Sequence, residues 1–191
     1  MCPKSPEQNE EVRKQSLQNI LDAAFVLMAK QGYESTSISQ IAKHAGVSKG
    51  LLYNYFSSKE EMLITLVDNT MNEGDSLLSE LDFGDPKGAL RAILNWYFDE
   101  LIEKPDHWKL ITELTFKIEK FDFVQQIFIT KLNEYVALLE QLLSNIGFDN
   151  PNEEARLMVS LFDGIGIHYL VMRDGYPIEK MREFLILKYC G

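Results

Sequence analysis

Cysteine is scarce in this 191-residue sequence, and so is any pattern that would use it. The two cysteines, Cys2 and Cys190, lie at opposite ends of the chain, without a CxxC pair or a metal-ligand spacing. This usage predicts a reduced, cytoplasmic protein without a disulfide framework. The polar N-terminus lacks the apolar stretch of a signal peptide, and we find no uninterrupted apolar run of transmembrane length. Neither secretion nor a membrane partner is therefore expected.

Strand patterns and catalytic motifs are missing as well. No segment alternates apolar and polar residues, whereas helical spacing recurs throughout, which predicts an all-α protein. The three histidines, His44, His107 and His168, are far apart and form no HExxH motif. Gly164 and Gly166 follow no strand, so they do not make a dinucleotide loop. The sequence therefore predicts a protein that is not an enzyme and that binds neither a metal nor a cofactor.

Acidic side chains are absent from Ser35 to Lys59, although the chain carries 29 Asp and Glu residues and a formal net charge of −10. The charged side chains in that window are three lysines. Residues 1–61 hold seven basic and seven acidic residues, so the whole net charge belongs to residues 62–191. A surface that approaches phosphates excludes carboxylates because each would repel the nucleic-acid backbone. The distribution predicts a protein that contacts nucleic acid with its N-terminal part only.

The acid-free window contains the pattern of two short helices joined by a tight turn. Thr36 and Ser37 can cap the first helix, and Ser48 can cap the second. Gly46 stands where the first helix must end, since glycine adopts the left-handed conformation without a Cβ clash. Apolar residues at helical spacing would face a common core: Ile38, Ile41, Ala42, Ala45, Leu52 and Phe56. This pattern is typical of a helix-turn-helix that binds DNA.

The segment VSKGLLYNYFSSKEEM resembles the signature of the TetR family of transcriptional regulators. The resemblance is specific over residues 13–67 and only architectural beyond them. It implies a homodimeric repressor that binds a near-palindromic operator in double-stranded DNA and is released by a small apolar or aromatic effector. The implied DNA contacts are Ser37 and Ser39 on phosphate, then Ser48, Lys49, Gly50, Leu51, Tyr53 and Asn54 in the major groove, then Tyr55 and Lys59 on the backbone. The plain alternative is a helical hairpin in an unrelated protein.

Two features of this part of the sequence suggest narrow base readout. Leu51 stands where similar proteins often carry a polar residue or threonine. Its side chain can contact a thymine methyl group but donates no hydrogen bond. No arginine lies between Arg13 and Arg91, so bidentate recognition of guanine by arginine is not expected from the DNA-binding domain.

The chain is expected to divide into two domains. Residues 1–58 would form the helix-turn-helix DNA-binding domain, with residues 1–10 as a mobile arm. Residues 59–191 would form a helical domain for ligand binding and dimerisation. A long helix from Lys59 to about Leu81 would connect them. Within it, Gly74 is either a hinge that transmits effector binding or a small residue that relieves crowding against a neighbouring helix.

The C-terminal domain is rich in aromatic residues, and most of these are ordinary core residues by default. An effector cavity lined by some of them is implied by the resemblance, and the candidates are Trp96, Phe98, Trp108, Phe116, Phe128 and His168. The last two helices are expected to pair with those of a second copy through Gly164, Gly166, Met181, Leu185 and Tyr189. Two alternatives remain open. One is a DNA-binding adaptor whose body binds a protein partner, and the other is an enzyme with a DNA-binding head.

Overall fold

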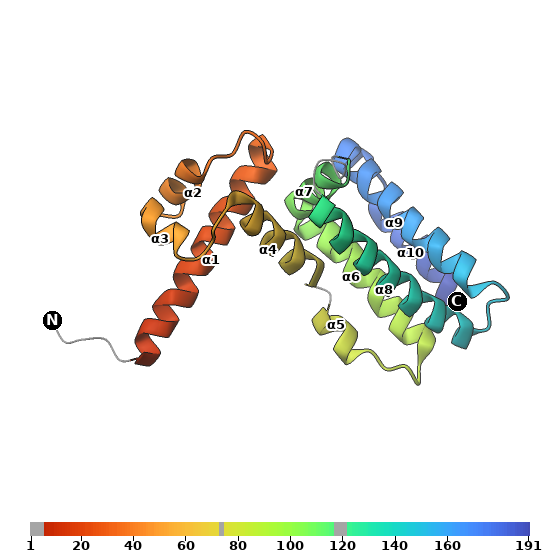
Figure 1. Cartoon of the computed structure of the whole chain (residues 1–191). Coiled ribbons are helices and arrows are strands. Elements are labelled where there is room, and N and C mark those ends of the chain that lie inside the picture. The colour runs from red at the N-terminus through yellow and green to blue at the C-terminus, as the bar shows by residue number, and fades with distance from the viewer. Residues whose placement is uncertain (1–5, 73–74, 117–121) are drawn as a thin grey trace. The chain divides into compact units, whose positions relative to one another are not determined.

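The computed structural model describes residues 6–72, 75–116 and 122–191. All the regular structure in these ranges is helical, which confirms the predicted all-α class (Figure 1). The chain divides into two compact units, Met1–Thr70 and Met71–Gly191, called the head and the body below. The expected domain limit after residue 58 stays a prediction.

The head is built from four helices that share one core. They are α1 (Pro6–Gln31), α2 (Ile38–His44), α3 (Lys49–Tyr53) and α4 (Lys59–Asn72). Each contributes fully or nearly fully buried apolar side chains: Ile20, Ala24 and Met28 from α1, Ile41 and Ala42 from α2, Leu52 from α3, and Met62 and Leu63 from α4. Phe56, in the turn after α3, is buried with them. This burial fixes α2 and α3 against α1, as the apolar spacing predicts.

The start of α1 differs from the expected mobile arm. The helix already begins at Pro6, because proline fits the first turn of a helix, where no backbone N–H is needed. Residues 6–10 are therefore helical, and the prediction of an arm over residues 1–10 is wrong for them. The first fully buried side chain of α1 is Ile20. The N-terminal turns of this helix thus run beyond the core of the head (Figure 1).

The connecting segment is described in two parts. α4 is described to Asn72 and α5 covers Asp75–Glu80, so the predicted continuous helix stays a prediction. Gly74, the predicted hinge, lies outside the described residues. At the start of α4, the backbone N–H of Glu61 donates to Ser58 Oγ at 3.0 Å. The Glu61 carboxylate accepts from the backbone and hydroxyl of Ser57, both at 2.6 Å, one residue earlier than a regular capping box requires.

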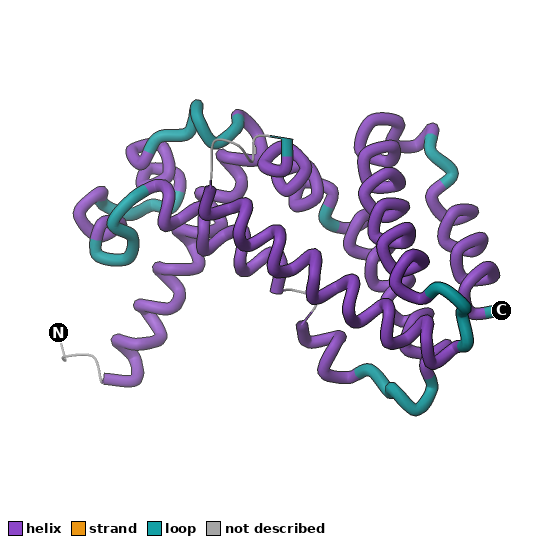
Figure 2. The backbone as a smooth tube through the Cα atoms, turned by 45° about the vertical axis from the view of Figure 1, so that its right-hand side comes forward, coloured by secondary structure: helices purple, strands orange, loops and turns teal. Residues whose placement is uncertain are grey.

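The described part of the body contains α5, five longer helices and a short 3-10 helix at Arg173–Gly175, seen from a second side in Figure 2. These are α6 (Pro86–Glu103), α7 (Pro105–Thr115), α8 (Asp122–Ile146), α9 (Pro151–Met172) and α10 (Ile178–Cys190). α8 packs on α9, α6 packs on both α8 and α10, and α7 packs on α6 and α9. Pro86, Pro105 and Pro151 each stand in the first turn of their helix, where proline is favoured.

Tyr97 of α6 lies at the centre of this packing. Its ring stacks on Phe162 of α9 at a centroid distance of 4.4 Å and meets the edge of Trp108 of α7 at 5.3 Å. Its hydroxyl donates to the carbonyl of Phe162 at 2.6 Å. Burial raises the pKa of Tyr97 well above its usual range, with the negative charge of Asp163 as the next cause. The phenol therefore stays neutral and ties three helices together.

α9 is unusual among the described helices in being apolar while little of it is buried. By length and composition alone, Pro151–Gly175 could cross a membrane, although it contains no uninterrupted apolar run of that length. This is weak evidence for a membrane, since helices of water-soluble proteins pass the same test. Only 22% of the apolar window is buried within the chain. The other positions of this helix are half-buried or exposed.

Candidate nucleic-acid interface

The turn between α2 and α3 is fixed by its caps and by one glycine. The Ser37 hydroxyl accepts the backbone N–H of Gln40 at 3.3 Å, and the Gln40 side chain accepts the backbone N–H of Ser37 at 2.7 Å. Gly46 has a φ of 68°, the left-handed conformation that the sequence predicts there. Ser48 then caps α3, since its hydroxyl accepts the backbone N–H of Leu51 at 3.1 Å. The serines and the glycine therefore orient α3 through local hydrogen bonds.

α3 turns one face to the core and the other to solvent. Leu52 is fully buried, whereas Leu51 is 36% exposed and Tyr53 is 54% exposed. Lys49 and Asn54 are exposed as well. The helix ends at Tyr53 with Asn54 as its cap. Lys49, Gly50, Leu51, Tyr53 and Asn54, predicted to enter the major groove, are all on the solvent side.

Tyr55, expected to hold the DNA backbone, makes a contact within the head. Its hydroxyl donates to the main-chain carbonyl of Arg13 in α1 at 3.3 Å. The contact links the turn behind α3 to the N-terminal half of α1. Tyr55 therefore helps to position α3, whatever contact its ring edge makes with DNA.

Lys59, the first residue of α4, is also engaged within the head. Its ammonium donates to the carbonyls of Tyr33 and Thr36, each at 2.9 Å. It also lies 4.1 Å from the centre of the Tyr33 ring, within the range of a cation–π interaction. An ammonium has three donors, so one N–H remains beyond these two bonds. Lys59 thus joins α4 to the α1–α2 turn, a role that sequence spacing did not indicate.

The candidate effector residues do not gather into one site among the described residues. Trp108 contacts Tyr97, whereas Phe98 is fully buried and lies under the guanidinium of Arg182 from α10. Phe116 is 77% exposed at the end of α7. His168 is exposed on α9. Trp96 and Phe128 are half-buried on α6 and α8. The predicted cavity therefore stays a prediction.

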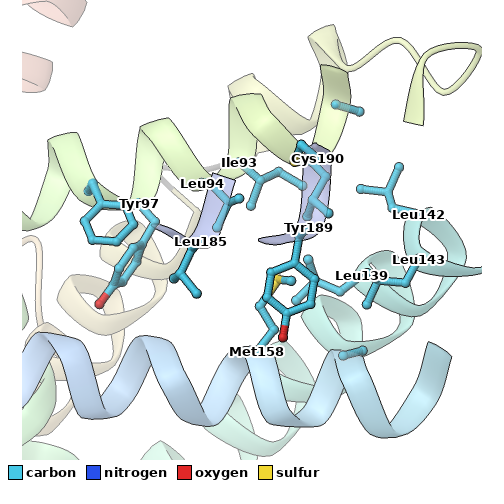
Figure 3. Packing of buried hydrophobic residues seen from close by; sticks show 14 of the residues in the cluster. Ile93, Leu94, Tyr97, Leu139, Leu142, Leu143, Met158, Leu185, Tyr189 and Cys190 are labelled. Atoms are coloured by element: carbon cyan, nitrogen blue, oxygen red, sulfur yellow. The ribbon is translucent and has the colours of Figure 1, made fainter. Parts of the chain in front are cut away.

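The candidate dimer residues divide between the inside and the outside of the body. Leu185 and Tyr189 are buried in the core, with Leu139, Leu143 and Met158 around them (Figure 3). Gly166 is buried too, and a Cβ there would lie 3.5 Å from the Tyr97 hydroxyl. Met181 is half-buried against the same core. A Cβ at Gly164, by contrast, would meet nothing within 4 Å. Leu185, Tyr189 and Gly166 hold the protomer together and are not open to a second copy, which corrects their predicted role.

Comparison with known proteins identifies the family. The model of bacterial regulatory proteins of the TetR family matches residues 20–66, from α1 into α4. The uncharacterised HTH-type transcriptional regulator YvkB of Bacillus subtilis (strain 168) is 30% identical over 177 residues, covering 86% of this chain and 89% of YvkB. The chain belongs to the TetR family. It is therefore a DNA-binding transcriptional regulator, and α3 is its recognition helix in the sense of the helix-turn-helix.

Solved structures of TetR regulators extend the likeness to the body. A transcriptional regulator from Rhodococcus sp. Rha1 superposes with a TM-score of 0.77 at 24% identity, over 91% of this chain and 93% of that one. FadR of Bacillus subtilis, solved in complex with stearoyl-CoA, gives 0.73 at 22% identity, over 91% and 97%. At such identities the likeness shows the TetR fold alone. Two other curated Bacillus subtilis regulators align over 64% and 47% of their own length.

Proposed function

We propose that this TetR regulator is a cytoplasmic homodimeric repressor that leaves its operator when a small apolar or aromatic effector binds to the body. Operator binding is supported by the solvent face of α3, which presents Lys49, Tyr53 and Asn54 in a window without carboxylates. Ser37, Ser39 and Ser48 would meet phosphates beside it. Lys59 would add a backbone contact through its remaining donor.

The DNA end is tested by separating charge from base readout. The probe is the duplex that the wild-type protein selects from a random-sequence pool, compared with a scrambled duplex of equal length. Lys49→Ala is expected to lower the affinity for both duplexes by the same factor. It should also flatten the salt dependence of log K by about 0.9 for each phosphate that is no longer neutralised. Tyr53→Phe is expected to leave the salt dependence intact and to reduce the preference for the selected duplex. If the wild-type protein selects no sequence, the proposed repressor function is wrong.

The second copy is proposed to pair with the outer face of α9 and α10. Leu157, Leu161, Gly164, His168 and Val171 follow one another at spacings of three and four along α9 and form one stripe. Leu157 is 49% exposed and Val171 is 78% exposed. On α10, Phe184 and Leu187 are 58% and 72% exposed. A second copy would cover this apolar face, and two recognition helices about 34–36 Å apart would read a near-palindrome.

The effector is proposed to be an uncharged apolar or aromatic molecule. FadR of Bacillus subtilis binds stearoyl-CoA, which makes an acyl-CoA the competing candidate. The diphosphate and the 3′-phosphate of an acyl-CoA would have to approach residues 62–191, which carry the whole net charge of −10. Opposite charge raises the local concentration of a ligand and like charge lowers it. The charge of the body therefore supports an uncharged effector over an anionic one.

Intrinsic fluorescence gives a direct test of the effector. The chain has two tryptophans, Trp96 and Trp108, and both lie in the body. An uncharged aromatic probe, N-phenyl-1-naphthylamine, is expected to quench their emission and to weaken operator binding, whereas stearoyl-CoA is expected to do neither. If stearoyl-CoA releases the protein from its operator and the uncharged probe does not, the effector is an acyl-CoA and the proposal of an uncharged effector is wrong. No response to any small molecule would favour the adaptor that binds a protein partner.

A further inference from the structure

A groove of about 420 Å³ lies on the head between α1 and the recognition helix. Its lining consists of Val12, Arg13 and Ser16 from α1, and of Leu51, Asn54 and Tyr55 from α3 and the turn behind it. None of these residues is acidic, and Arg13 is exposed. The groove therefore joins the N-terminal turns of α1 to the surface that is proposed to enter the major groove.

We propose that this groove receives a phosphate of the DNA strand that borders the major groove, and that Arg13 binds it. The inference rests on the proposed placement of α3 in the major groove. Because the two sugar-phosphate strands form the rims of that groove, an element fixed beside α3 meets a strand rather than a base edge. α1 is such an element, since Tyr55 ties its backbone at Arg13 to the turn behind α3.

The hydrogen bonds around the groove decide which groups can donate to a phosphate. The hydroxyl of Ser16 donates to the Val12 carbonyl at 2.8 Å, and that of Tyr55 donates to the Arg13 carbonyl at 3.3 Å. Both hydroxyl hydrogens are therefore used within the head. The guanidinium of Arg13 and the side-chain amide of Asn54 are the remaining donor groups in the lining. A guanidinium binds a phosphate through two parallel N–H bonds.

The length of α1 supports the same assignment. The helix begins at Pro6, yet its buried residues begin at Ile20, so several turns project past the core. A DNA contact on these turns would give them a function that the core of the head does not explain.

The helical spacing of the sequence predicts on which side of α1 Arg13 lies. Leu17, Ile20 and Ala24 mark the inward stripe of α1. One step of four residues back from Leu17 reaches Arg13, which falls on the same side of the helix. The sequence-based expectation concerned bidentate recognition of guanine, not contacts with phosphate, and it considered the helix-turn-helix alone. The structure places one arginine beside it.

The test compares two neighbouring cations on α1. Arg13→Ala and Lys14→Ala each remove one exposed positive charge from the same turn, but only Arg13 lines the groove. Affinity is measured for the selected duplex and for the scrambled duplex between about 50 and 200 mM salt. Arg13→Ala is expected to lower the affinity for both duplexes by a similar factor. It should also reduce the slope of log K against log salt concentration by about 0.9 per protomer, twice that per dimer. Lys14→Ala is expected to change the slope clearly less.

One further variant, a control measurement and two contrary outcomes complete the experiment. Arg13→Lys should keep most of the salt slope and lose part of the affinity, because a lysine offers the charge without the fork. The circular dichroism of all variants should match the wild-type protein, since both side chains are exposed. Equal slopes for Arg13→Ala and Lys14→Ala would overturn the phosphate site while Lys49→Ala still weakens binding. A changed duplex preference with an unchanged slope would also overturn it, in favour of a base contact.

Discussion

At the scale of single residues, apolar positions were predictable and long polar side chains were not. Leu52 and Phe56 were assigned to the core from their spacing alone, and both are buried there. Lys59 was assigned to DNA because its place after the motif resembles a backbone contact. Its bonds to the α1–α2 turn depend on how closely α4 approaches that turn. Such an approach is set by tertiary packing and leaves no periodic signal.

Lys59 is therefore expected to affect both stability and DNA binding. Lys59→Ala removes two hydrogen bonds from a charged donor, which should lower the free energy of unfolding by about 1–3 kcal/mol. It should also lower the affinity for all duplexes by the same factor and flatten the salt dependence of log K by about 0.9 per protomer. Chemical denaturation and salt titration measure the two effects separately. A lower stability with an unaltered salt slope would assign Lys59 to the fold alone.

At the scale of elements, helix interiors were predicted well and helix ends less well. The turn at Gly46 agrees with the structure. The start of α1 does not, because a favourable first-turn proline moves the start of a helix without changing the apolar pattern. The last helix shows a different limit. α10 has apolar residues on two sides, Leu185 with Tyr189 and Phe184 with Leu187, and spacing alone does not tell which side faces the core.

The cap of α3 permits a test that separates folding from recognition. Ser48→Ala should lower the free energy of unfolding by about 1 kcal/mol, since it removes the acceptor for the Leu51 backbone N–H. Ser48→Asp keeps an acceptor and should keep the stability. It also introduces a carboxylate into the acid-free window, so operator affinity should fall about tenfold or more through repulsion of phosphates. Thermal melting and DNA titration of both variants decide the matter. Wild-type affinity in Ser48→Asp would remove this end of α3 from the interface.

The contact between α10 and α9 makes a pH-dependent contribution to stability. The Tyr189 hydroxyl donates to Glu154 at 3.1 Å, and burial followed by the Glu154 charge raises the pKa of Tyr189 to about 12 from 10.0. A raised folded-state pKa means that the contribution is complete below pH 10 and is lost as the pH rises towards 12. Tyr189→Phe should cost about 1 kcal/mol near neutral pH. The difference from the wild-type protein should shrink above pH 10. A difference in the free energy of unfolding that stays constant from neutral pH to above pH 10, measured by urea titration, would contradict this prediction.

At the scale of the whole molecule, the uneven distribution of charge was readable from the sequence, whereas the assembly was not. Counting residues shows that residues 1–61 carry no net charge and that residues 62–191 carry the whole −10. The surface that a second copy would cover depends on which apolar side of α9 and α10 is used inside the protomer. That choice is made by α6 and α8, whose side chains enclose Leu185 and Tyr189 (Figure 3).

The proposed dimer is tested on the outer apolar face with a matched control. Leu187→Glu and Val171→Glu place a charge on residues that are 72% and 78% exposed, so the protomer should stay folded while the dimer dissociates. Ile129→Glu makes the same change at a 45% exposed position of α8 and should leave the dimer intact. A dimer binds two half-sites at once and gains affinity because its two DNA-binding heads are linked. A monomer lacks this gain, so operator affinity should fall by about 10²- to 10⁴-fold. Sedimentation and operator titration are measured on all three variants. Dimers that persist in both Leu187→Glu and Val171→Glu would show that a second copy pairs elsewhere.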